Sequence, residues 1–189
     1  PDHPDTLTSM GKLASSYAAL HRHADASKLH EQRLTLAKAR HGMDHQATLA
    51  AMNGLAAFLA TASDLQFRDP ARAVELATKT AESSTEKSVQ SADYRGTLGV
   101  ARYRSGDWSK ARADLEMAIG MRQADDWRNA PNGFFLAMSH WQLGDKAKAR
   151  EWFDRAVQWV EKGKKDDPEL KRFRAEAAEL LGAKGETTK

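Results

Sequence analysis

The sequence predicts an all-α fold made of about four helical hairpins followed by one terminal helix. Three observations predict it: internal repeats, a helix-forming composition, and glycine–aspartate breaks within the later repeats. Alanine, leucine, lysine, arginine and glutamate dominate the 189-residue chain, which contains only 5 prolines, and these residue types favour helices. No stretch alternates apolar and polar residues as a strand does. The repeats are about 40 residues long, and repeats of that length indicate helical hairpins that stack on one another.

The first part of the chain contains two related units. HPDTLTSMGKLASSY, from His3, aligns with HQATLAAMNGLAAFL, from His45, at an offset of 42 residues. Apolar residues recur three and four positions apart in both segments, which is typical of amphipathic helices. This part is predicted to form helices at 4–20, 24–40, 46–62 and 70–84. The aligned identities are His3/His45, Thr6/Thr48, Leu7/Leu49, Met10/Met52, Leu13/Leu55 and Ala14/Ala56.

The later part repeats at an offset of 38 residues. A glycine ends the first helix of each pair, because glycine adopts the left-handed conformation at little cost. The aspartate that follows can cap the next helix. These signals predict helices at 90–104, 107–122, 131–142 and 145–162. The aligned identities are Leu98/Leu136, Gly106/Gly144, Asp107/Asp145, Lys110/Lys148, Ala111/Ala149, Arg112/Arg150 and Ala118/Ala156.

A ninth helix is predicted at 168–181. It begins at Pro168, and proline is tolerated in the first turn of a helix. Its apolar residues are sufficient to cover the last hairpin, as the terminal cap of a repeat array must. The tail, 183–189, is expected to be disordered.

The hairpins resemble those of the tetratricopeptide repeat (TPR) family. LGVAR and SGDWSKARADLEMA in the third unit, and LAMSH and LGDKAKAREWFDRA in the fourth, carry the resemblance. HPDTL and LHEQRLTLAKARHG in the first two units resemble the 42-residue repeats of kinesin light chains. The resemblance implies a right-handed superhelix with repeats at about 3–44, 45–86, 87–126 and 127–167.

Some positions depart from the family pattern. Arg95 and Gly133 stand where the family often has tryptophan, and Arg102 and His140 stand where it often has tyrosine. The second unit also carries about five extra residues within ATASDLQFRDP, which lengthen the turn before its second helix.

The two ends of the sequence suggest a wider setting. The carboxyl-terminal segment resembles the end of large bacterial multidomain proteins that carry a kinase or WD-repeat region. The start aligns with the loop between two repeats, so we expect a longer protein and a first repeat without a cap. Self-association through that uncapped repeat is a further expectation, as is a cytoplasmic, signalling role.

Several classes of chemistry lack their residues in this sequence. There is no cysteine, no glycine-rich phosphate loop and no HExxH or GxSxG motif. His21, His23 and His30 are the nearest thing to a metal or acid–base cluster, but a zinc site needs three or four converging ligands. Asp125-Asp126 and Asp166-Asp167 are better explained as acids at helix starts. We therefore predict no enzyme activity, no metal and no cofactor.

The family resemblance implies that the first helix of each hairpin lines a concave groove. A protein-interaction scaffold that binds a peptide or protein segment in that groove is the predicted function. The residues that match groove positions are Lys12, Ser15, Asn53, Ala57, Thr97, Val100, Arg104, Phe134, Met138 and Trp141.

The aromatic and methionine residues among them form a stripe that would suit an apolar anchor, unless the ninth helix covers it. A regulatory or substrate-recruiting segment of a bacterial Ser/Thr kinase remains an alternative. Nucleic-acid binding is a more distant one, because positive charges are mixed with acids and the net charge is only +3. No apolar run is long enough to cross a membrane.

Overall fold

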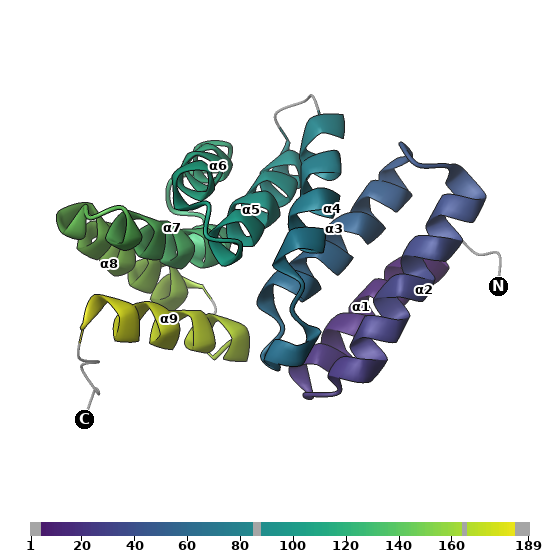
Figure 1. Cartoon of the computed structure of the whole chain (residues 1–189), viewed down its shortest axis with the longest axis horizontal. Coiled ribbons are helices and arrows are strands. Elements are labelled where there is room, and N and C mark those ends of the chain that lie inside the picture. Colours follow the sequence, from purple (N-terminus) through teal and green to yellow (C-terminus); the bar gives the residue numbers. More distant parts are fainter. Residues whose placement is uncertain (1–4, 85–87, 164–165, 184–189) are drawn as a thin grey trace. The chain divides into compact units, whose positions relative to one another are not determined.

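The computed structural model describes residues 5–84, 88–163 and 166–183, and every regular element in these ranges is a helix. The chain divides into two compact units, Pro1–Glu86 (unit 1) and Lys87–Lys189 (unit 2). Each unit contains two antiparallel helix pairs, and unit 2 ends with the additional helix α9 (Figure 1). No helix in the described ranges is long and apolar enough to cross a membrane.

Unit 1 contains two hairpins, α1–α2 and α3–α4, with α3 packed against α2. The extra residues of the second hairpin form a short 3₁₀ helix, η1, that contacts α2. Asp69 caps α4 by accepting a hydrogen bond from the backbone N–H of Arg72 (3.0 Å), and Pro70 takes the first helical position. The elements are α1 (Asp5–Ala19), α2 (His23–His41), α3 (Gln46–Thr61), η1 (Leu65–Phe67) and α4 (Pro70–Ser83).

Unit 2 contains the hairpins α5–α6 and α7–α8, and α9 packs against α7 and α8. Gly106 and Gly144 both adopt the left-handed conformation (φ 86° and 87°). Asp107 and Asp145 then cap α6 and α8 through their carboxylates, as the sequence predicts. The elements are α5 (Val89–Arg104), α6 (Trp108–Gly120), η2 (Trp127–Asn129, a 3₁₀ helix), α7 (Ala130–Gln142), α8 (Lys146–Lys162) and α9 (Pro168–Leu181).

The predicted all-α class and the pairing of helices are confirmed. Each of the nine α-helices in the described ranges begins and ends within two residues of its predicted bounds. The two 3₁₀ helices were not predicted, because three-residue elements leave no periodic pattern in a sequence. The tail predicted to be disordered lies outside the described residues, apart from Ala183.

Two departures from the family pattern are explained by their partners within unit 2. Arg95 and Arg102, on α5, both pair with Asp114 on α6, whose side chain is only 6% exposed. The Arg95 Nη1 to Asp114 Oδ1 distance is 3.1 Å. The two α5 positions where the resemblance implies aromatic residues are thus held by ion pairs to one buried acid.

The other departure is the small residue Gly133 on α7. A Cβ at this position would lie 2.9 Å from both the Ala156 Cβ and a ring carbon of Trp159. Trp159 is buried, and its Nε1 donates a hydrogen bond to the carbonyl oxygen of Ala124 (2.9 Å). A tryptophan from α8 thus packs directly against the position where the family often places one on the first helix.

Candidate functional site

In unit 1, four of the predicted groove residues lie on the two first helices. Lys12 and Ser15, on α1, are exposed, and the Ser15 hydroxyl donates a hydrogen bond to the Gly11 carbonyl of its own helix (3.2 Å). Asn53 and Ala57, on α3, are half-buried. These two helices contact each other, so the four residues belong to one packed pair of first helices.

Asn53 has an unsatisfied polar atom. Its Oδ1 is buried and makes no hydrogen bond within the described part of the chain. A buried carbonyl oxygen without a donor costs free energy. Because this oxygen is also shielded from solvent, it is a local cost to unit 1, and a ligand on the surface would contact the rest of the half-buried Asn53 side chain.

Arg33, from α2, also reaches this surface and was missed by the sequence reasoning. A Cβ added to Gly11 on α1 would lie 2.9 Å from the Arg33 Cζ, and one added to Gly54 on α3 would lie 3.0 Å from its Nη1. Arg33 Nη1 also donates a hydrogen bond to the Ala50 carbonyl oxygen (3.3 Å). The guanidinium thus lies between two glycines of neighbouring first helices, and mid-helix glycines were the available signal for such a close approach.

In unit 2, the α5 residues of the predicted groove are mostly engaged. The Thr97 hydroxyl donates a hydrogen bond to the Asp93 carbonyl of its own helix (3.0 Å), and Val100 is buried. The side chain of Arg104 is only 9% exposed and forms a bidentate ion pair with the carboxylate of Glu176 on α9. Its guanidinium also lies over the Phe135 ring, 4.9 Å from the centroid.

The predicted aromatic–methionine stripe on α7 is largely inaccessible. Phe134 and Met138 are completely buried, and Phe134 packs on Phe153 of α8 with ring centroids 5.8 Å apart. Helix α7 contacts α5, α6, α8 and α9, so little of its surface is left open. The expectation that Phe134 and Met138 are open to a ligand is therefore wrong.

Trp141 is the one member of that stripe with partial exposure. Lys146 Nζ lies 3.5 Å from the centroid of its ring, and Arg150 Cζ lies 6.0 Å away. These distances fit cation–π contacts. The ring is therefore already covered on one side by a cation of its own hairpin.

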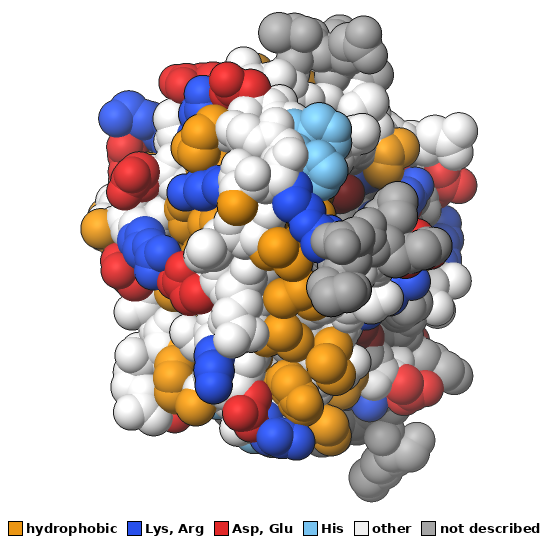
Figure 2. All heavy atoms as spheres, turned by 90° about the vertical axis from the view of Figure 1, so that its right-hand side faces the viewer, with side chains coloured by type: hydrophobic (Ala, Val, Ile, Leu, Met, Phe, Trp, Pro, Cys, Tyr) orange, Lys and Arg blue, Asp and Glu red, His pale blue; other side chains and the backbone are white. Residues whose placement is uncertain are grey.

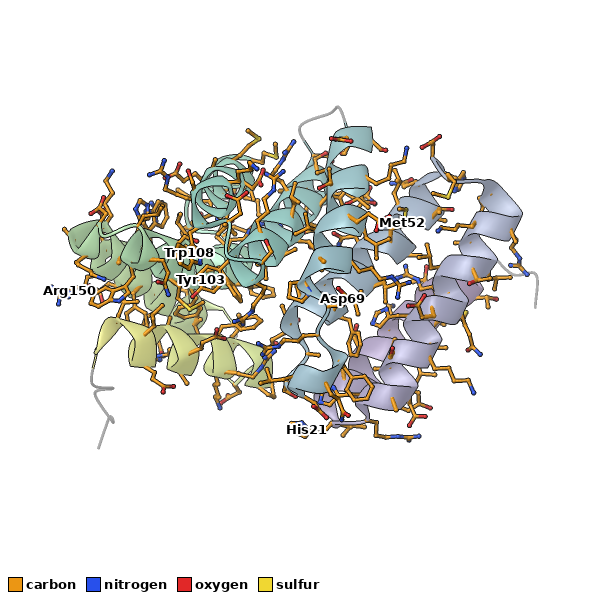
Figure 3. All side chains as sticks on the ribbon, in the orientation of Figure 1. His21, Met52, Asp69, Tyr103, Trp108 and Arg150 are labelled. Carbon is orange, nitrogen blue, oxygen red and sulfur yellow. The ribbon has the colours of Figure 1, made fainter. Side chains whose placement is uncertain are left out.

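Tyr103 extends the engaged surface toward α7. It lies near the end of α5 (Figure 3), and its ring meets Phe135 edge-on at 5.4 Å. Burial, followed by the nearby charge of Glu176, raises the pKa of Tyr103 above its usual value. The phenol therefore stays neutral and contributes mainly packing.

The described histidines of unit 1, His21 to His45, do not come together as a metal or catalytic cluster. Among the described residues, no group of three or more His, Asp or Glu side chains is placed to hold a metal ion. His23 Nε2 lies 2.8 Å from the Ser63 hydroxyl, and His21, at the α1–α2 turn (Figure 3), lies 3.5 Å from the same oxygen. The His23 Nδ1 is buried without a hydrogen-bond partner. A histidine that acts as general base for a serine nucleophile is normally oriented by an acceptor at its other ring nitrogen, and His23 has none among the described residues.

His30 makes the stability of unit 1 depend on pH. Its burial, helped by the charge of Arg33, lowers its pKa to about 4, whereas an unfolded chain has the usual value of about 6.5. Below pH 6.5 the unfolded state takes up a proton that the folded state does not. We therefore expect this residue to cost about 2 kcal/mol of stability between pH 7 and pH 5.

Urea unfolding followed by far-UV circular dichroism at both pH values measures this effect. His30→Leu should weaken the pH dependence by that amount, whereas His41→Leu, an exposed position on the same helix, should leave it as in the wild type. His140 in unit 2 is also buried, and burial lowers its pKa. Both variants retain it, so its contribution to the pH dependence is the same in the variants and the wild type. Equal pH slopes for wild type and His30→Leu would contradict the assignment.

A scan against protein-family models finds no match for the chain, and a search of curated proteins finds none. Solved structures do match. One is the crystal structure of the nearly identical TPR-like repeats of a Podosopora anserina kinesin light chain, with 20% identity and a TM-score of 0.68 over 96% of this chain and 90% of that one. A variant of the same protein gives 20% identity and a TM-score of 0.68 over 96% and 89%. The chain thus has the fold of TPR-like repeats.

Proposed function

We propose that this chain is a non-catalytic protein-interaction module that binds a peptide or protein segment on the first helices of unit 1. The observation that carries the proposal is the set of polar side chains on α1 and α3: exposed Lys12, exposed Ser15 and half-buried Asn53. A peptide backbone supplies carbonyl acceptors for the Lys12 ammonium and for the Asn53 side-chain amide, both of which are donors. The TPR-like fold supports the proposal, because helical repeats offer extended concave binding surfaces.

The charges favour an acidic partner. The Lys12 ammonium donates hydrogen bonds but accepts none, and Arg33 brings a guanidinium to the same pair of helices. Carboxylates are the natural partners of both groups, since charge-assisted hydrogen bonds are stronger than neutral ones. We therefore expect an extended peptide with at least one acidic side chain.

Selection of a displayed peptide library on the immobilised full chain provides the probe. The best acidic peptide would be labelled and titrated against wild type, Asn53→Ala and Lys12→Ala. Each variant should bind about fivefold more weakly or worse, because one hydrogen bond contributes about 1 kcal/mol. Lys28→Ala, an exposed lysine on α2, is the matched control and should bind as the wild type does. Unchanged affinity in both test variants would remove unit 1 as the binding surface.

A second kind of partner is another copy of the chain. Met10, Leu13 and Tyr17 on α1, with Leu20 directly after it, form one stripe (the α1 stripe). Leu13 and Leu20 are 46% and 68% exposed. At the repeat offset of 42, the equivalent residues of the second hairpin are all buried: Met52, Leu55, Leu59 and Ala62. Hydrophobic side chains gather in a band on this side of the molecule (Figure 2). We infer weak self-association through the α1 stripe.

Sedimentation equilibrium tests this inference. The apolar stripe is small, so we expect a dimer with a dissociation constant of about 100 µM, at the weak end of the range for protein interfaces. Leu13→Lys should abolish the dimer. Leu65→Lys, which changes another exposed leucine of unit 1, should not. A wild-type chain that stays monomeric at about 1 mM would contradict the inference, because that lies ten times above the expected constant.

The wider setting expected from the sequence, a cytoplasmic regulatory segment of a bacterial signalling protein, forms part of this proposal. Two observations support it: the resemblance of the carboxyl-terminal segment, and the lack of cysteine, which suits a reducing compartment. Sequencing the gene around this segment tests it, and a reading frame without a signalling domain would contradict it.

A further inference from the structure

Helix α9 departs from the way the other helices of this chain stack. In unit 1, α3 contacts the second helix α2 of the preceding hairpin more extensively than the first helix α1, and α7 does the same with α6 and α5. Helix α9 reverses this preference, because it contacts α7 more extensively than α8. It therefore lies toward the first helices of unit 2, where the groove residues were expected.

Two residues of α9, one turn apart, make its specific contacts. The ring of Phe173 meets Phe135 of α7 edge-on, with centroids 5.0 Å apart. The carboxylate of Glu176 accepts two hydrogen bonds from the Arg104 guanidinium of α5, one of them from Nη2 at 2.7 Å. Because Arg104 also stacks on Phe135, these four side chains form one continuous contact across α5, α7 and α9.

The α5–α7 surface has a strong requirement for an acid at this point. Arg104 is almost completely buried, and its Nε has no hydrogen-bond partner within the described residues. Its charge is balanced by Glu176, which belongs to neither hairpin. A buried guanidinium without a carboxylate is unfavourable, so any helix that replaced α9 would have to supply an acidic group to Arg104.

We propose that the α5–α7 surface is a binding site for an amphipathic helix that carries an aromatic residue and, three positions later, an acidic one, and that α9 is its resident occupant. A partner helix with this pattern competes with α9 through the Phe173 and Glu176 positions. The inference extends the proposed function from unit 1 to unit 2, and it rests on that proposal only in taking first helices as the binding surface.

Helix α9 is covalently linked to the α5–α7 surface through the chain, whereas a partner helix is not. A tethered segment acts at an effective concentration in the millimolar range, so a free peptide of the same sequence competes poorly with it. Weakening α9 within the full chain should therefore uncover the site. Glu176→Lys does this directly, because it replaces the carboxylate that balances Arg104 with a positive charge.

The probe is a fluorescein-labelled peptide with the sequence of residues 166–183, titrated against the full-length chain by anisotropy. Wild type should bind weakly, with a dissociation constant above about 100 µM, and Glu176→Lys should bind at least about tenfold more tightly. Glu179→Lys, at an exposed position on α9, should behave as wild type. A peptide in which the phenylalanine is replaced by alanine should lose binding to the Glu176→Lys chain.

A charge reversal keeps the test decisive if Glu176→Lys unfolds. Arg104→Glu also repels the resident helix, and this chain should bind a peptide with arginine in place of the glutamate while rejecting the natural peptide. Such an exchange of preference does not follow from a purely structural cap. A folded Glu176→Lys or Arg104→Glu chain that binds no peptide, or that binds both peptides equally, would overturn the proposal. These outcomes are independent of binding at Lys12 and Asn53.

Discussion

Replacing Asp114 with alanine is expected to lower the free energy of unfolding of unit 2 by about 2–4 kcal/mol. Asp114 is almost fully buried and holds both Arg95 and Arg102. Its removal leaves two arginines, each about one-quarter exposed, without their acid. Their partial contact with water keeps the expected cost below that of a fully buried pair. Urea unfolding followed by tryptophan fluorescence measures it, because all 5 tryptophans lie in unit 2.

Asp154→Ala is the matched control, since Asp154 is an exposed acid of the same unit and should change stability by less than about 0.5 kcal/mol. A triple variant provides the converse test. Arg95→Met, Arg102→Met and Asp114→Leu together replace the charges with apolar groups and should return stability to within about 1 kcal/mol of wild type. Equal stability of Asp114→Ala and Asp154→Ala would show that the three charges do not act as a unit.

Replacing Trp159 with alanine is expected to cost unit 2 about 3–5 kcal/mol, the usual range for deleting a buried aromatic ring. The ring packs against Gly133 of α7, and its Nε1 hydrogen bond ties α8 to Ala124 in the segment before η2. The substitution removes both contacts and opens a cavity. The same fluorescence measurement applies, because four tryptophans remain.

Trp152→Ala provides the comparison on the same helix. Trp152 is only half-buried, so its loss should cost about 1 kcal/mol. Gly133→Ala adds a coupling test. In the wild type its new methyl group meets the Trp159 ring and the Ala156 Cβ, and in Trp159→Ala one of these two clashes is absent. Gly133→Ala should therefore cost less in the Trp159→Ala background, and purely additive effects would contradict close packing at this point.

The helices were predictable because their signals are local. Three- and four-residue spacing, glycine after a helix, and aspartate before one each act within a few residues of the chain. The pairing of helices was predictable from the repeat itself. The partnership of Arg95 and Arg102 with Asp114 left a visible signal too, since the two arginines lie seven positions apart on one helix face and an acid stands in the next helix.

The accessibility of the groove could not be predicted in the same way. Phe134 and Met138 have the spacing of an exposed stripe, but their burial depends on the packing of helices α5, α6, α8 and α9 around α7. The engagement of Arg104 by Glu176 joins residues 72 positions apart, and no pattern in the sequence marks it. The repeat alignment matches Leu13 of α1 with Leu55 of α3, but only the structure shows that the first is exposed and the second buried.

The connectivity of the helices also bears on how the chain folds. Within each unit, helices pack against their immediate neighbours or the next helix but one, so only short loops must close before native contacts form. Low contact order of this kind is associated with folding in microseconds to milliseconds. Each hairpin can thus assemble as it leaves the ribosome, where residues are added far more slowly, at about 5–20 per second, and Arg104 in α5 is made before the acid that neutralises it.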